Sequence, residues 1–284
     1  MLVTLKEILK IAEEKNIAVG AFNAPNLESL QAVMSAAEEV QLPVIIQFAP
    51  VHETFNLLAD MGPLMMSYAK RVSVPVCVHL DHGEDLDYIK KALDLGFTSV
   101  MYDGSALDFE KNVANTCIAV EMAEEYGASV EAEIGCMGRE EFGSVGAEGD
   151  AVESMYTDPD EAKEFVGRTG IDALACSFGT VHGLYLTEPK LDFDIISAIR
   201  EKAQIPIVMH GGSGVSPEDF SECIKRGVRK INYYTYAAKA GGENVKKHCD
   251  EADGVVYFHD VAAWGREAMK ADVMAAMKVF AGME

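Results

Sequence analysis

Three histidines of the 284-residue sequence follow short apolar runs that have the composition of buried strands. His82 ends the run VPVCVHLDH, His182 comes soon after DALACSFG, and His210 stands near the end of IPIVMHGG. A lone histidine is more often a hydrogen-bonded residue near the surface, but three at strand ends can converge. Neutral imidazoles from separate strands, with one coordination position left open, form catalytic Zn²⁺ sites. We therefore predict that these histidines hold one catalytic Zn²⁺.

Carboxylates stand close to the proposed ligands. Asp81 directly precedes His82, so it can exchange a proton with a substrate hydroxyl near the metal, or merely orient a histidine. Asp103 and Glu133 belong to the fourth and fifth apolar runs, and we expect them to lie close to the three histidines. There they would form a second or alternative divalent position, or support the ligands. Glu141 lies in a Gly-rich acidic segment, 135–154, that we predict to be a lid whose carboxylate can act as a base.

The other histidines lack this context. His79 is interpreted as structural, or as a support for the ligands beneath Asp81. No role in the metal site is expected for His52, His248 or His259.

The sequence also contains a candidate phosphate site. A net charge of −22 disfavours an anionic substrate unless N–H groups, basic side chains or a metal receive it locally. The seventh run is followed by Gly211-Gly212-Ser213-Gly214, and the eighth ends in Asn232-Tyr233-Tyr234-Thr235. Barrel enzymes frequently bind phosphate with the loops after strands seven and eight. Glycines allow close backbone approach, and Ser213 and Thr235 add hydroxyl donors.

These residues can form one site only in a fold that brings the ends of several strands close together. Eight β-branched runs alternate with amphipathic stretches, clearest at 27–40, 85–96 and 109–127, which predicts parallel βαβ units. No G-x-G-x-x-G follows the first run, so we favour an α/β fold of the (β/α)8 TIM barrel type, one catalytic domain over 1–284, above an open doubly wound sheet. The final stretch, 261–283, predicts an amphipathic helix that packs on the barrel or a partner subunit. The expected strands are 18–24, 43–49, 74–82, 98–104, 128–135, 172–179, 205–212 and 229–235.

Composition narrows the class of protein further. The acidic charge should repel nucleic acid and anionic membranes, so neither is an expected partner. The six cysteines form no C-x-x-C pair, which is typical of free thiols in a reducing cytoplasm. The N-terminus lacks the apolar core of a signal peptide, and no run approaches a membrane span. We therefore expect a cytoplasmic enzyme.

Taken in order, these motifs resemble the class II, metal-dependent ketose-bisphosphate aldolases, which act on fructose or tagatose bisphosphate. The resemblance covers nearly the whole chain. It rests on VGAFNAPNLES, VCVHLDHGED, VMYDGSALDFEKN, VEAEIGCMGREE, FGTVHGLY, VMHGGSG and KINYYTY.

The resemblance implies a zinc-dependent lyase of carbohydrate metabolism, such as glycolysis. It would cleave a ketose phosphate, for example fructose or tagatose 1,6-bisphosphate, reversibly into dihydroxyacetone phosphate and an aldehyde. Zn²⁺ would act as a Lewis acid on the ketone and hold an enediolate. Asp81 would be the acid and base at the C4 hydroxyl, and Glu141 would move a proton at C3.

The resemblance also implies the remaining site residues. His82, His182 and His210 would bind Zn²⁺, with Asp103 and Glu133 at the alternative position. The substrate would contact Gly183, Gly211, Gly212, Ser213, Asn232, Tyr233, Tyr234, Thr235, Asn23 and Gln47. A monovalent cation near the phosphate and a homo-oligomer, dimer or tetramer, are further implications.

The chain departs from the family pattern on the aldehyde side. Tyr234 stands where fructose-type members commonly have Asp and tagatose-type members a small residue. Ala49 replaces a Ser or Thr after the second strand, and Arg139 interrupts the usual Gly-Gly-Glu-Glu. An aldehyde other than glyceraldehyde 3-phosphate is therefore open, with Arg139 or His52 near its distal group.

Two other functions are compatible with parts of this pattern. A metal-dependent sugar-phosphate epimerase would use the same enediolate without breaking a carbon–carbon bond. A non-catalytic barrel subunit would have no reason to keep the three histidines together with Asp81.

Overall fold

The computed structural model describes residues 1–135, 156–181, 183 and 189–283. Eight parallel strands close into a barrel in the order β1 to β8. β1 closes the barrel by pairing with both β2 and β8, so the prediction of a (β/α)8 barrel is confirmed. The strands are β1 Val19–Asn23, β2 Val44–Phe48, β3 Val76–Gly83, β4 Ser99–Tyr102, β5 Ser129–Ile134, β6 Ala173–Cys176, β7 Ile207–Met209 and β8 Val228–Tyr233.

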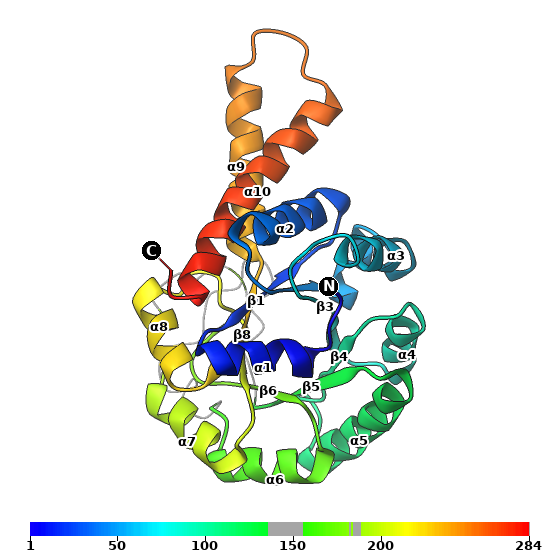
Figure 1. Ribbon diagram of the computed structural model, residues 1–284, viewed down its shortest axis with the longest axis vertical. Helices are drawn as coiled ribbons and strands as arrows, with labels where there is room; N and C mark the ends of the chain where they lie inside the picture. The colour runs from blue at the N-terminus through cyan, green and yellow to red at the C-terminus, as the bar shows by residue number, and fades with distance from the viewer. Residues whose placement is uncertain (136–155, 182, 184–188, 284) are drawn as a thin grey trace.

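Helices surround the barrel (Figure 1). Side-chain caps define several helix starts; for example, Asp108 accepts a 2.9 Å hydrogen bond from the Lys111 amide. Gly127 and Gly170 end two helices in the left-handed conformation, which favours glycine. The helices are α1 Leu5–Lys15, α2 Leu27–Val40, the 3-10 helix η1 Pro50–Thr54, α3 Leu58–Ala69, α4 Leu86–Asp94, α5 Phe109–Tyr126, α6 Pro159–Thr169, α7 Phe193–Ala203, α8 Pro217–Lys225, α9 Thr235–Glu251 and α10 Phe258–Phe280.

Several strands end before the predicted residue, among them β4 at Tyr102 and β6 at Cys176. β7 spans only Ile207–Met209, and β8 ends at Tyr233 rather than at 235. Tyr234 has φ −144° and ψ −55°, which turns the chain directly into α9. The expected strand over 229–235 was therefore wrong at its last two residues, and Thr235 is the first residue of a helix.

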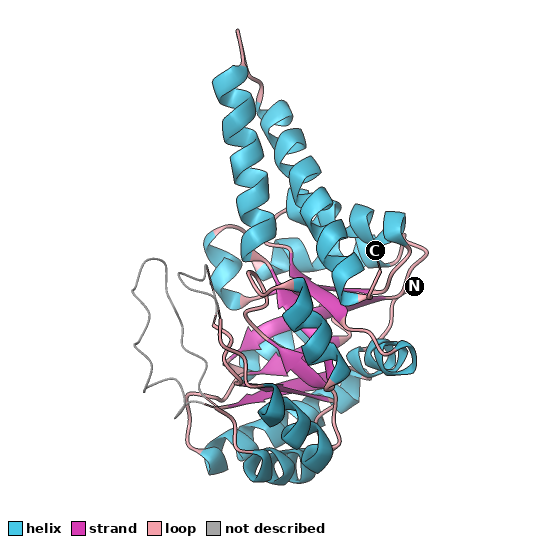
Figure 2. Cartoon of the chain, turned by 90° about the vertical axis from the view of Figure 1, so that its left-hand side faces the viewer, coloured by secondary structure: helices cyan, strands magenta, loops and turns pink. Residues whose placement is uncertain are grey.

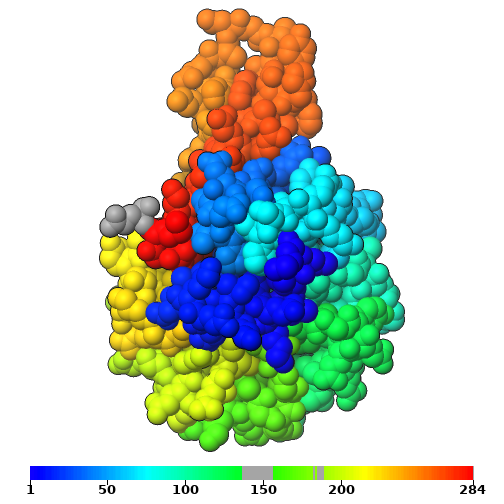
Figure 3. All heavy atoms as spheres, viewed as in Figure 1, coloured from blue at the N-terminus to red at the C-terminus, as the bar shows by residue number. Residues whose placement is uncertain are grey.

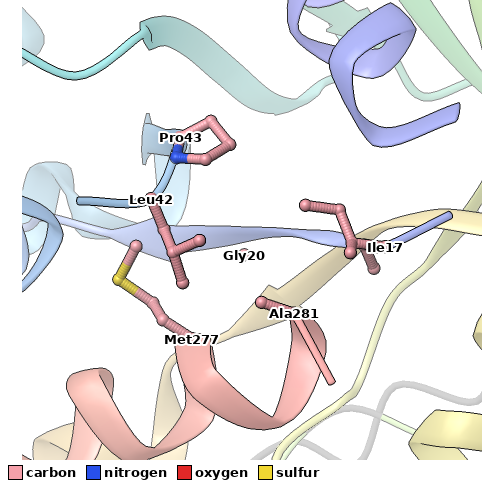
Figure 4. Close-up of a pocket in the computed structure, with 7 residues that line it drawn as sticks. Ile17, Gly20, Leu42, Pro43, Met277 and Ala281 are labelled. Atoms are coloured by element: carbon pink, nitrogen blue, oxygen red, sulfur yellow. The ribbon is translucent and has the colours of Figure 1, made fainter. Parts of the chain in front are cut away.

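Helix α1 covers the amino-terminal end of the barrel (Figure 3). Leu5, Ile8 and Leu9 are at most 1% exposed and pack with the aliphatic residues of the barrel interior. A small apolar pocket nearby is lined by Gly20, Pro43 and Met277 among others (Figure 4). This end is closed by apolar packing, so polar chemistry belongs at the opposite, carboxyl-terminal end of the strands.

Helices α9 and α10 form a hairpin that projects from the barrel (Figures 1 and 2). The second half of α10 is anchored by Val273, Met277 and Phe280, all buried. The expectation that the final helix packs on the barrel is thus confirmed. Among the described residues, no helix combines the length and apolar character needed to cross a membrane.

Candidate metal and active site

The end of β3 is irregular where its polar residues stand. Its pairing with β4 shifts between Leu80 and Gly83, so β3 carries one extra residue there. His82 has a left-handed backbone with φ 48°, which costs a non-glycine residue on the order of 1 kcal/mol. A bulge redirects side chains. As a result the consecutive residues Asp81 and His82 both offer atoms to one cluster with His210.

Asp81 is buried, and both of its carboxylate oxygens accept hydrogen bonds. Oδ1 accepts a 3.0 Å hydrogen bond from Asn232, and Oδ2 accepts bonds of 3.0 Å from Gln47 and 3.3 Å from Asn23. Burial alone would raise the pKa of Asp81, but His82 and other nearby positive groups hold it well below its usual range. The carboxylate is therefore ionised and oriented by three amides.

His82 is fixed by Asp103. Its Nδ1 lies 2.7 Å from Asp103 Oδ2, while the other oxygen accepts bonds of 2.7 and 3.2 Å from Ser105. Burial opposes the charged imidazole, but Asp81 and the bond to Asp103 outweigh it and raise the pKa of His82 to about 9. The Nδ1 side of the His82 ring is thus held by Asp103.

His210 is fully buried between two glutamates of β5. Its Nε2 lies 2.9 Å from Glu131 Oε1, and its Nδ1 lies 3.4 Å from Glu133 Oε2. Its ring centre is 4.6 Å from that of His82. Burial lowers the pKa of His210, so the neutral imidazole is favoured. A neutral imidazole is the form that binds metals.

Two groups at this end suit a metal ion. One comprises Asp81, His82 and His210, and the other His82, Asp103 and Glu133; within each, the candidate ligand atoms lie within 4.8 Å of one another. Glu133 Oε2 is buried and accepts no hydrogen bond from any described residue. Burial and the charge of Asp103 raise the pKa of Glu133 to about 8. Imidazole and carboxylate donors beside an unsatisfied buried oxygen fit a divalent cation such as Zn²⁺.

The predicted phosphate residues lie on adjoining loops. The amide of Gly212 donates a 3.0 Å bond to the carbonyl of Asn232, and the amide of Tyr234 donates a 3.2 Å bond to Ser213 Oγ. A Cβ on Gly211 would lie 2.3 Å from the carbonyl oxygen of Val181. Glycine is thus required where these loops meet.

Helix α9 directs its amino terminus to the same loops. It begins at Thr235 without a side-chain cap from Tyr234 and has no acidic residue in its first turn. Uncapped N–H groups and the helix dipole favour an anion at such an end. Thr235 thus stands at a helix end that favours an anion, and its place in a phosphate cradle stays a prediction.

The side chain of Tyr233 lies elsewhere. Its ring packs 6.0 Å from Phe22 and 6.1 Å from Phe280, between the barrel and α10. Its hydroxyl interacts with Asp272, and burial raises the pKa of Tyr233. Tyr233 was predicted to contact the substrate, but it can do so only through its backbone.

His52 is buried beside Tyr234, on the side where the distal group of an aldehyde was expected. It is 5% exposed, its ring centre lies 5.3 Å from that of Tyr234, and its Nδ1 accepts a 3.4 Å bond from the Ala49 amide. Burial lowers the pKa of His52 to about 4. Tyr234 and Ala49, two of the three residues expected to depart from the family pattern, thus border one neutral histidine. Their proximity could not be read from their separation in sequence.

Some predicted residues lie outside the described part of the chain, namely Arg139, Glu141 and His182. Gly183 is described and has φ 106°, a conformation that favours glycine. Lys230, which was not predicted as part of the site, is fully buried in β8 and pairs with Glu131. Its only signal was a lysine inside an otherwise strand-like run, VRKINY.

The chain is similar to known proteins over its whole length. Residues 3–283 match the family described as fructose-bisphosphate aldolase class-II. A probable fructose-bisphosphate aldolase of Bacillus subtilis is 42% identical, over 98% of this chain and 97% of that protein. The fructose-bisphosphate aldolase of Geobacillus stearothermophilus is 41% identical, over 98% and 96%. The crystal structure of the YdjI aldolase from Escherichia coli K12 matches with a TM-score of 0.87 and 36% identity, covering 99% of this chain and 97% of that one.

Proposed function

Because this chain belongs to the class II fructose-bisphosphate aldolase family and is an aldolase, a lyase, we propose that it is zinc-dependent and reversibly cleaves a ketose phosphate. Fructose and tagatose 1,6-bisphosphate are the first substrates to test, with dihydroxyacetone phosphate and an aldehyde as products. The observation that carries this proposal is the cluster of Asp81, His82 and His210 beside the loops of β7 and β8.

His82 and His210 would hold the metal through one imidazole nitrogen each, with His182 as the third ligand. Asp103 and Glu133 would offer a second position, since both share a cluster with His82. When bound, Zn²⁺ polarises the ketone carbonyl of the substrate.

Asp81 would carry the proton of the carbon–carbon bond step. In cleavage it takes the proton of the C4 hydroxyl, the C3–C4 bond breaks, C4 becomes the aldehyde carbon, and the electron pair stays with the C3 fragment. Glu141 would then deliver a proton to C3. The hydrogen bonds from Asn23, Gln47 and Asn232 support this role, since they hold the carboxylate in one orientation.

The phosphate of the dihydroxyacetone half would lie on the loops after β7 and β8. Gly183, Gly211, Gly212 and Ser213 would surround it, with the amino terminus of α9 at Thr235 supplying N–H groups. A monovalent cation beside this phosphate is proposed because the chain has a net charge of −22.

The aldehyde half would be bordered by Tyr234, Ala49 and His52. A neutral histidine and a phenol offer hydrogen bonds without a fixed charge. We therefore propose an aldehyde whose distal group is a hydroxyl or another neutral polar group, in place of the phosphate of glyceraldehyde 3-phosphate.

The residues 1–284 are proposed to form one catalytic domain that assembles into a homodimer or homotetramer. A reducing cytoplasm is proposed as its location, because the five cysteines in the described ranges are free thiols.

The test is an aldol-addition screen with dihydroxyacetone phosphate and a panel of aldehydes, paired with cleavage assays on both bisphosphates. Activity should disappear with chelator and return with Zn²⁺. Triose phosphate release identifies an aldolase, whereas a changed sugar configuration without triose phosphate would identify an epimerase. A purified protein that binds no divalent metal would refute the proposal.

A further inference from the structure

A buried ion pair lies beneath the metal cluster. Lys230 Nζ lies 2.8 Å from Glu131 Oε2 and donates a 3.1 Å hydrogen bond to Glu131 Oε1; both side chains are 0% exposed. The interior of such a barrel is usually filled by branched aliphatic side chains. Replacing a buried ion pair by well-packed apolar residues is often neutral or stabilising. Packing alone therefore gives no reason for Lys230.

The geometry joins this lysine to a proposed ligand. Glu131 Oε1, which receives the bond from Lys230, also lies 2.9 Å from His210 Nε2. An ammonium group only donates, so Lys230 fixes Glu131 as an acceptor. His210 Nε2 must then be the nitrogen that carries the hydrogen. Its Nδ1, which lies 3.4 Å from Glu133 Oε2, then keeps the lone pair and is the nitrogen that would bind the metal.

We propose that Lys230 is a positioning residue of the metal site, which acts through Glu131 to set the tautomer of His210. Lys230 is fully buried and its ammonium group pairs with Glu131, so it would act on the metal only through that residue. The inference rests on the proposed function only in placing the metal at His210. Partners that orient a metal-bound histidine typically change metal affinity by about 10- to 100-fold.

Lys230→Met tests this with a side chain of similar length. Affinity for Zn²⁺, measured by competition with a chromogenic chelator, should fall about tenfold or more. The matched control is Arg229→Met, because Arg229 is the neighbouring basic residue of β8 and pairs with Glu13 of α1 at 2.8 Å, away from His210. It should lose stability but keep its metal affinity. Equal affinities of Lys230→Met and wild type would overturn the proposal.

Glu131→Gln provides a sharper test. With Lys230 present, the side-chain nitrogen of this glutamine cannot replace either oxygen of Glu131 without losing a hydrogen bond or facing a positive charge. At the Oε1 position it removes the acceptor of His210, and at the Oε2 position it lies against the ammonium group. Metal affinity should therefore fall. In Glu131→Gln with Lys230→Met, the nitrogen can occupy the Oε2 position, 3.7 Å from His79 Nε2, and the oxygen can again face His210.

The double variant should thus regain part of the affinity that Glu131→Gln loses. Additive losses would contradict the proposal.

The tautomer itself can be observed without any variant. In metal-free wild-type protein labelled with ¹⁵N-histidine, His210 should show the hydrogen on Nε2, assigned by loss of its signals in His210→Gln. A hydrogen on Nδ1 would refute the proposal, even if Lys230→Met failed to fold. Aldol cleavage by the wild type tests the proposed function separately, because neither the tautomer nor the affinity ratios depend on turnover.

Discussion

Asn232 and Asp81 are 151 positions apart, yet Asn232 Nδ2 donates a 3.0 Å hydrogen bond to Asp81 Oδ1. The barrel produces this contact by pairing β8 with β1, β1 with β2 and β2 with β3, the strand of Asp81, which also brings Gln47 to the second oxygen. The carboxylate is thus held from three strands besides its own. A group held in this way can receive a proton at a defined place, which is the requirement for acid–base catalysis.

Asp81→Asn should remove this proton transfer while keeping the shape of the side chain. We expect kcat to fall by about 10²- to 10⁴-fold, the range usual for loss of a general base. Steady-state cleavage kinetics and metal content by atomic absorption check the result. Metal content should remain that of wild type if the ligands are His82, His182 and His210 as proposed, even though an oxygen of Asp81 lies in the same cluster. An Asp81→Asn enzyme with wild-type kcat would exclude this residue as the proton carrier.

Gly212→Ala should weaken phosphate binding. A Cβ there would lie 2.7 Å from Ile231 Cγ2 and 2.8 Å from the Asn232 carbonyl oxygen, so the loop must shift. Loss of one hydrogen bond to a charged group is worth about 1.5 kcal/mol or more, or about tenfold in affinity. We therefore expect the KM for the ketose phosphate to rise about tenfold. Gly167→Ala in α6 is the control, because nothing lies within 4 Å of its added Cβ; a similar KM increase there would argue against the cradle.

The sequence was sufficient for the barrel because strand and helix patterns alternate eight times, and local patterns encode that alternation. It also indicated that His82 and His210 lie at strand ends, since each follows a buried run. In the structure these two histidines form one cluster with Asp81. What the prediction missed depends on contacts between distant strands. The pairing of Lys230 with Glu131 across the interior is such a contact.

Local backbone conformation was the other source of error. Tyr234 ends β8 early because its ψ of −55° leaves the strand region, and no residue type requires that turn. Tyr233 then directs its ring to Phe22 and Phe280 instead of the mouth. A shift of one residue reverses the face of a strand side chain, so such assignments need coordinates.

His52 should make stability depend on pH. Burial lowers its pKa from 6.5 to about 4 in the folded state, so the unfolded chain binds more protons between these values. The stabilisation is therefore complete above about pH 6.5 and is lost as the pH falls towards 4. The full difference corresponds to roughly 3 kcal/mol at most.

Urea unfolding of wild type and His52→Asn at pH 7 and pH 4.5 measures this effect. Asn can still accept the hydrogen bond from the Ala49 amide. The free energy of unfolding of wild type should fall more steeply with acid than that of His52→Asn. Parallel pH dependences would show that His52 does not remain neutral in the folded protein.

Tyr234→Ala should alter the choice of aldehyde without affecting the dihydroxyacetone half. The ring of Tyr234 lies 5.3 Å from that of His52, centre to centre, whereas its backbone faces Ser213. Pocket changes of this kind alter discrimination by about 1–3 kcal/mol, or roughly tenfold and more. The kcat/KM ratio between two aldehydes of different length should shift by that factor, while solvent exchange of the C3 proton of dihydroxyacetone phosphate stays near wild type. Tyr126→Ala, on the outside of the barrel in α5, should change neither. If Tyr234→Ala slows proton exchange and leaves the aldehyde ratio unchanged, Tyr234 serves the phosphate half and the aldehyde must be selected elsewhere.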